Sequence, residues 1–141
     1  LLAKVALLAL LGSVSGALLC TGLFLAHVVS RTWPLLLIRL MPHVGDAAGS
    51  KSKPLADQIS VASLGAAFVW TSMALALVVY LYGPPMSLFV PLVTAILASG
   101  LVFVIMWRWF WRRLQGFTGD CLGTTQQLCE LAFYLGLALG V

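Results

Sequence analysis

Residues 61–107 read VASLGAAFVWTSMALALVVYLY-GPP-MSLFVPLVTAILASGLVFVIMW. This stretch contains no charged side chain, and Gly83, Pro84 and Pro85 interrupt it near its middle. About 20 apolar residues in a helix are needed to cross the hydrocarbon layer of a bilayer. Each side of the interruption supplies that length, so the sequence predicts two spanning helices, Val61–Tyr82 and Met86–Trp107, joined as a tight hairpin.

The composition of the whole chain agrees with a membrane setting. Of the 141 residues, 62% are hydrophobic and only 9% are charged, and the mean hydropathy is +1.07. A soluble domain of this size has too small an interior to hide that much apolar surface, and the excess would cause aggregation. The sequence therefore predicts an all-α, polytopic integral membrane protein.

Two further apolar runs flank the hairpin. The first extends from Val5 to Val29, and the last extends from Cys121 to Val141 and is polar in its first half. The run Trp33–Met41 is too short to cross a bilayer, so we expect it either to lie at the interface or to extend the first span. Residues 1–141 are thus expected to form a single transmembrane domain of about four helices.

Basic residues predict the orientation, because Lys and Arg accumulate in cytoplasmic loops. The hairpin tip carries no basic residue, whereas the segments 30–60 and 108–120 carry seven of the eight. We therefore expect the tip to lie outside the cytoplasm and both polar segments to meet at the cytoplasmic face. Trp107, Trp109 and Trp111 are typical of an aromatic belt at that face.

Cysteine and histidine offer no evident metal or redox site. Cys20, Cys121 and Cys129 are odd in number and lack a C-x-x-C spacing, so we interpret them as small packing residues. His27 and His43 have no second ligand at a metal-binding spacing. No metal site is expected from this chain alone.

Two polar segments in the first half each allow two interpretations. Arg31, close behind His27, either marks the membrane interface by snorkelling or binds a phosphate with its planar guanidinium. The loop from Gly45 to Pro54 carries Lys51 and Lys53 among small residues. That loop could bind an anion through its ammonium and backbone N–H groups, or it could be a solvated connector.

The third polar segment, from Arg112 to Glu130, is the most informative. Thr118 or Asp120 could cap the following helix, which would be a sufficient structural reason for either residue. Glu130 lies about three turns into an otherwise apolar helix. An ionisable group at that depth is costly in lipid and is by default a functional hypothesis.

This segment resembles the C-terminal signature of the cobalamin synthase family, the adenosylcobinamide-GDP ribazoletransferases. The family pattern is Gly-Gly-x-Thr-Gly-Asp-x-Leu-Gly-Ala, followed by Leu-x-Glu. The chain departs from it at Gln115, where Gly is usual, and at Thr124, where Ala is usual. The matching residues are Gly116, Thr118, Gly119, Asp120, Leu122, Gly123, Leu128 and Glu130.

The resemblance implies an enzyme that joins alpha-ribazole, or its phosphate, to adenosylcobinamide-GDP with release of GMP. It implies Asp120 and Arg31 as catalytic residues, magnesium as cofactor, and a bacterial inner-membrane location. The residues expected to bind substrate or phosphate are Lys51, Lys53, Thr118, Gly119 and Glu130. The partners expected are these small molecules and the lipid bilayer, with no nucleic acid and with homo-oligomerisation left open.

The family carries an Asp-rich motif in its N-terminal half that this sequence lacks. The chain also begins in apolar sequence without Met. We therefore expect it to be the C-terminal portion of a longer membrane enzyme, with most magnesium ligands outside it. The alternative is a non-enzymatic membrane scaffold or transporter subunit, in which three Gly-x-x-x-Gly patterns mediate helix packing.

Overall fold

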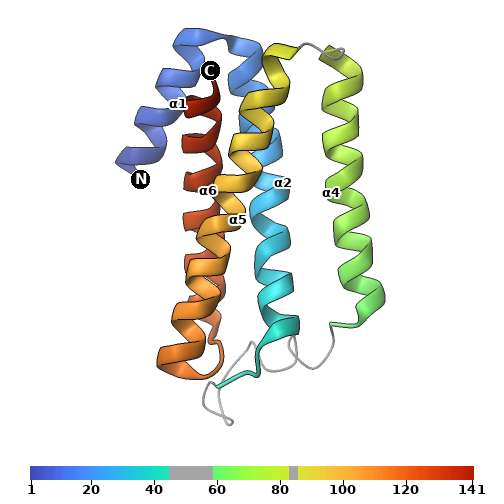
Figure 1. Cartoon of the computed structure of the whole chain (residues 1–141), viewed down its shortest axis with the longest axis vertical. Helices are drawn as coiled ribbons and strands as arrows, with labels where there is room; N and C mark the ends of the chain where they lie inside the picture. The colour runs from blue at the N-terminus through green and yellow to red at the C-terminus, as the bar shows by residue number, and fades with distance from the viewer. Residues whose placement is uncertain (45–58, 83–85) are drawn as a thin grey trace.

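The computed structural model describes residues 1–44, 59–82 and 86–141, and nearly all of them are helical. The helices run roughly along one long axis, as Figure 1 shows. In chain order they are α1 (Leu2–Val14), α2 (Gly16–Leu40), α4 (Val61–Tyr82), α5 (Met86–Leu114) and α6 (Gly119–Gly140). By length and hydropathy, α2, α4 and α5 could each cross a membrane. The predicted all-α, polytopic fold class is confirmed; within the described residues three helices, rather than about four, are long and apolar enough to span.

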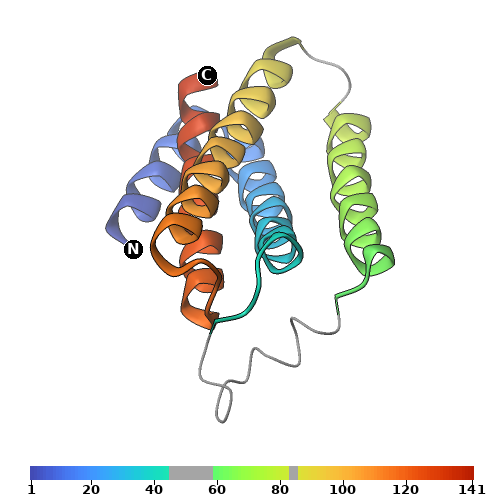
Figure 2. The same cartoon turned by 60° about the horizontal axis from the view of Figure 1, so that its bottom comes forward.

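The bundle is built around α6, which packs against α5, α2 and α1. Helix α4 packs on α2 at the other side and stands apart from α6 (Figure 2). Successive long helices alternate in direction, so the described ends of both polar segments lie at one end of the molecule (Figure 1). We call this the loop end; it contains residues 41–44 and 115–118. The turn between α1 and α2 lies at the opposite end, which we call the hairpin end.

The predicted first span, Val5–Val29, is wrong in its bounds because the chain breaks at Ser15. Ser15 has an extended backbone (φ −163°, ψ 131°), and its hydroxyl accepts a hydrogen bond from the Leu18 N–H at 3.5 Å. A serine in this position caps a new helix. The spanning helix is therefore α2, which continues to Leu40, and Trp33–Met41 is its helical extension rather than an interfacial segment.

Of the two spans predicted around Gly83–Pro85, the structure confirms the bounds of the first and extends the second. Helix α4 coincides with the predicted span Val61–Tyr82. Helix α5 runs on to Leu114, so most of the predicted loop after Trp107 is helical. Its 29 residues extend about 43 Å, more than the roughly 30 Å of hydrocarbon, which places the arginines of its last turns at the headgroup level.

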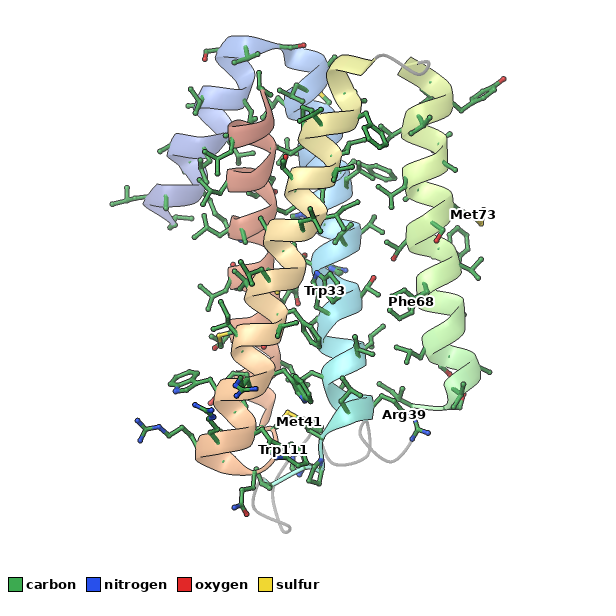
Figure 3. The ribbon with its side chains drawn as sticks, in the orientation of Figure 1. Trp33, Arg39, Met41, Phe68, Met73 and Trp111 are labelled. Atoms are coloured by element: carbon green, nitrogen blue, oxygen red, sulfur yellow. The ribbon has the colours of Figure 1, made fainter. Side chains whose placement is uncertain are left out.

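The buried core consists of two hydrophobic clusters, and Trp33 packs against both of them. Its indole stacks on Phe103 with ring centroids 5.0 Å apart, and its Nε1–H donates to the Ser99 hydroxyl at 2.8 Å. Figure 3 shows Trp33 between α2 and α5, whereas Arg39, Met41 and Trp111 lie toward the loop end. Cys121 and Cys129 are buried packing residues as predicted; Cys20 is exposed, so that interpretation is wrong for it.

Candidate functional site

The segment before α6 pairs with the segment after α2. The Val44 N–H donates to the Phe117 carbonyl, and the Phe117 N–H donates to the Pro42 carbonyl, both at 3.0 Å. The Phe117 ring is fully buried and meets the His43 ring edge-on at 5.3 Å. This pairing confirms that the described parts of the two polar segments meet at one end of the bundle.

Two residues of the signature make this pairing possible. Gln115 adopts a left-handed backbone with φ 54°, which ends α5 and turns the chain toward α6. A Cβ on Gly116 would lie 2.5 Å from the Pro42 carbonyl oxygen and would also overlap Val44. Only glycine therefore fits at position 116, because the two segments approach each other through this backbone.

Thr118, Gly119 and Asp120 form the start of α6. Thr118 occupies the N-cap position, but its side chain makes no capping bond and instead donates to Cys121 Sγ at 3.3 Å. The capping explanation therefore does not account for the Thr118 hydroxyl. The Asp120 side chain lies exposed in the first turn of α6.

An open groove continues from this helix start along α6. Its lining residues are Gly119, Asp120, Gly123, Thr124, Gln127 and Leu128. Asp120 and Gln127 are seven residues apart, or about two turns, so they share one face of the helix. The groove thus connects the loop end with the middle of the bundle.

A polar cluster lies at the upper end of this face. The Lys4 ammonium lies 2.7 Å from Glu130 Oε2 and donates to Gln127 Oε1 at 2.6 Å. The Tyr134 hydroxyl donates to Glu130 Oε1 at 3.1 Å, and His27 Nδ1 lies 3.6 Å from the same oxygen. The Glu130 side chain is only 7% exposed, so this carboxylate is buried and held by partners from three helices.

Arg31 belongs to the same region, not to the end of a span. It follows His27 by four residues on α2, which is one helical turn and the same face. It lies nine residues before the end of α2, about 14 Å from it, so it does not mark the helix end. The Arg31 side chain is exposed, and within the described ranges no carboxylate pairs with it.

The predicted site residues therefore lie at two levels. Thr118, Gly119 and Asp120 lie together at the loop end, whereas Arg31 and Glu130 lie higher in the bundle. Asp120 and Glu130 are ten residues apart on α6, or about 15 Å. Lys51 and Lys53 fall outside the described residues.

Sequence reasoning missed the contact between Lys4 and Glu130. Lys4 directly precedes the first apolar run and is the only charged residue before Arg31, and Glu130 is the only charged residue of α6 beyond its first turn. A lone cation and a lone anion in otherwise apolar helices are expected to pair, because neither can be left uncompensated in lipid. This expected pairing could have predicted from the sequence that α1 packs on α6.

Comparison with known proteins agrees with the signature. The profile of the family described as cobalamin-5-phosphate synthase matches residues 1–138. An adenosylcobinamide-GDP ribazoletransferase from Albidiferax ferrireducens is 63% identical over all of this chain and 54% of its own length. The same-named protein of Polaromonas naphthalenivorans is 52% identical over all of this chain and 53% of its own length.

A more distant relative of the same name, from Vibrio cholerae, is 41% identical over 79% of this chain and 39% of its own length. No solved structure matches the chain. The chain spans about half the length of the Albidiferax and Polaromonas relatives.

Proposed function

The chain belongs to the cobalamin-5-phosphate synthase family, and from this premise we propose that it forms part of an adenosylcobinamide-GDP ribazoletransferase of the bacterial inner membrane. The proposed reaction joins alpha-ribazole, or its phosphate, to adenosylcobinamide-GDP and releases GMP. The family match over residues 1–138 is the observation that carries this proposal.

The polar face of α2 and α6 suits the chemistry of this reaction. Displacing GMP from a pyrophosphate concentrates negative charge on the attacked and the leaving phosphate. In the part of the chain that the structure describes, no carboxylate pairs with the Arg31 guanidinium, and its planar fork fits two phosphate oxygens. We assign it the role of stabilising that charge, with Lys51 and Lys53 proposed from the sequence to assist.

The start of α6 is the second proposed contact. Backbone N–H groups in the first turn of a helix are free to bind an anion, and no side chain of the N-cap residue satisfies them here. We propose that Thr118 and Gly119 contact a substrate phosphate and that Asp120 orients a substrate group or a bound water. Glu130 is buried against Lys4. We propose that Glu130 acts indirectly, by holding the Lys4 ammonium in place.

Magnesium is the proposed cofactor, but these residues alone do not fit a magnesium site. Residues 1–44, 59–82 and 86–141 contain no group of three or more His, Cys, Asp or Glu able to hold a metal ion. Among the described residues, Asp120 is the only carboxylate that lines the groove. We therefore expect the metal ligands to come mainly from outside this chain.

The scaffold or transporter alternative has less support. Gly136 and Gly140 pack against Ala95 and Pro91 of α5, so this glycine pair serves contacts within the chain. A Cβ on Gly123 would meet nothing within 4 Å. The pair Gly136 and Gly140 is thus already used within the chain, and the family match favours the enzyme.

A chimera tests the proposal. This chain would replace the matching segment of the Albidiferax ferrireducens relative, and the chimera would be expressed in a bacterium that lacks ribazoletransferase and is fed cobinamide. We expect cobalamin synthesis to be restored, and Asp120→Asn and Arg31→Gln to reduce it at least about 100-fold at equal membrane levels. A chimera that inserts normally but restores nothing would refute the proposed function.

A further inference from the structure

We propose that Gln127 is a substrate-binding residue whose amide NH₂ group donates to a phosphate oxygen, and that Lys4 is the positioning residue that fixes this orientation. The inference rests on the proposed function and adds two residues to it. The sequence alone assigned neither residue a role at the site. The argument depends on two contacts of the Lys4 ammonium and on the hydrogen bond that Tyr134 donates to Glu130.

The orientation of the Gln127 amide follows from the chemistry of lysine. The Lys4 ammonium lies 2.6 Å from Gln127 Oε1. An ammonium group only donates hydrogen bonds, so the amide oxygen and not the amide nitrogen must face it. The Gln127 NH₂ group is consequently directed away from Lys4, and no described residue accepts a hydrogen bond from it.

Lys4 is itself held in place from below the surface. Glu130 Oε2 lies 2.7 Å from its ammonium, and the other oxygen of the same carboxylate accepts from the Tyr134 hydroxyl at 3.1 Å. Tyr134 is 1% exposed and Glu130 is 5% exposed. The buried Tyr134 and Glu130, together with the half-buried Lys4, thus determine the direction in which an exposed amide presents its two N–H bonds.

Helix geometry places the Arg31 guanidinium at the same depth. His27 of α2 lies beside Glu130 of α6, with 3.6 Å between Nδ1 and Oε1. The two helices run in opposite directions (Figure 1). One turn further toward the loop end therefore reaches Arg31 on α2 and Gln127 on α6 together.

An unpaired cation and a preoriented NH₂ donor at one level favour an anionic oxygen ligand. Gln127 also lines the groove that leads to Asp120, so a ligand here is continuous with the proposed site. A pyrophosphate has several acceptor oxygens and satisfies both donors. We therefore assign this position to a phosphate of the nucleotide-bearing substrate.

The substitution Gln127→Glu separates this role from a structural one. A carboxylate at position 127 still accepts from the Lys4 ammonium but also repels Glu130 one turn away, so a structural cost should appear as lower thermal stability. A merely structural glutamine predicts that the KM of the folded variant is unchanged. A donor role predicts the opposite, because the NH₂ group is lost and a negative charge faces the phosphate. We expect the KM for adenosylcobinamide-GDP to rise about tenfold or more, with a smaller change in kcat.

The measurement uses the purified chimera in lipid nanodiscs, with thermal stability recorded for each variant. Ser60→Glu adds the same charge at the exposed start of α4 and serves as the control. Lys4→Arg should keep most of the affinity. Lys4→Met should raise the KM, as Gln127→Glu does. If Gln127→Glu fails to fold, Gln127→Met takes its place, with the same expected rise in KM.

The outcomes distinguish the two proposals. A stable Gln127→Glu variant with unchanged KM in an active chimera refutes this inference alone. A well-inserted chimera that neither binds nor converts adenosylcobinamide-GDP refutes the proposed function and this inference with it. A raised KM for Gln127→Glu, with Ser60→Glu unchanged, supports it.

Discussion

At the residue scale, Gln115 holds a backbone conformation that glycine adopts more easily. Its φ of 54° lies in the left-handed region, where a Cβ contacts the following carbonyl and costs about 1–2 kcal/mol. The Gln115 N–H also donates to the Phe110 carbonyl at 3.1 Å, so the turn is fixed by hydrogen bonding. The cobalamin synthase pattern that the chain resembles has glycine at this position.

We predict that Gln115→Gly stabilises the protein. Relief of the strained backbone is partly offset by the greater freedom of glycine in the unfolded chain, which costs about 0.5–1 kcal/mol. The expected net gain in the free energy of unfolding is about 0.5–1 kcal/mol, measured by thermal unfolding in detergent. Gln115→Ala, which keeps a Cβ, should show no such gain; a lower melting temperature for the glycine variant would contradict the prediction.

At the element scale, α5 and α6 approach closely through two glycines. A Cβ on Gly136 would lie 2.5 Å from the Ala95 Cα and 2.6 Å from the Thr94 carbonyl oxygen. The Thr94 hydroxyl also donates to the Gly136 carbonyl at 2.8 Å. These neighbours are backbone atoms, which cannot move aside as the end of a flexible side chain can.

We predict that Gly136→Ala destabilises the bundle by about 1–3 kcal/mol, because it overfills the contact between α5 and α6. Gly65→Ala is the matched control: it also lies inside a helix, but its Cβ would meet nothing within 4 Å. That control should be neutral or slightly stabilising. Equal melting temperatures for the two alanine variants would mean that the close approach is not required.

The helix boundaries show how much of the fold the sequence could predict. Helix α4 was predicted to its ends, because an uncharged run between a polar segment and a Gly-Pro-Pro turn leaves little choice of boundary. The break at Ser15 was missed, because hydropathy sums over residues and ignores capping. Ser13, Ser15 and Gly16 together were the available signal of a helix start.

The candidate site divides in a similar way. The approach of the two polar segments was predicted from charge alone. The level of Arg31 was not, because it depended on where α2 begins and ends. The orientation of Gln127 could not be predicted either, since it depends on Lys4, a residue more than 120 positions away in the sequence.

At the scale of the whole molecule, basic residues gather at one of the two ends. Arg108, Arg112 and Arg113 lie near the loop end of α5, and Arg39 lies near the loop end of α2 (Figure 3). The turn at Ser15, at the hairpin end, carries no charged residue. Since basic residues are retained in the cytoplasm, the loop end should face the cytoplasm and the hairpin end should face the other side.

We predict opposite accessibility for two single cysteines placed at these ends. In a chimera whose chain has Cys20, Cys121 and Cys129 replaced by alanine, Gln115→Cys lies at the loop end and Ser13→Cys lies near the hairpin end. A membrane-impermeant maleimide should label Gln115→Cys only in inside-out vesicles and Ser13→Cys only in right-side-out vesicles. Labelling of both from one side would contradict the bundle as a membrane-crossing unit, whereas the reverse pattern would contradict only its orientation. Because the groove on α6 begins at the loop end, the expected result would also mean that nucleotide substrates reach Asp120 from the cytoplasm.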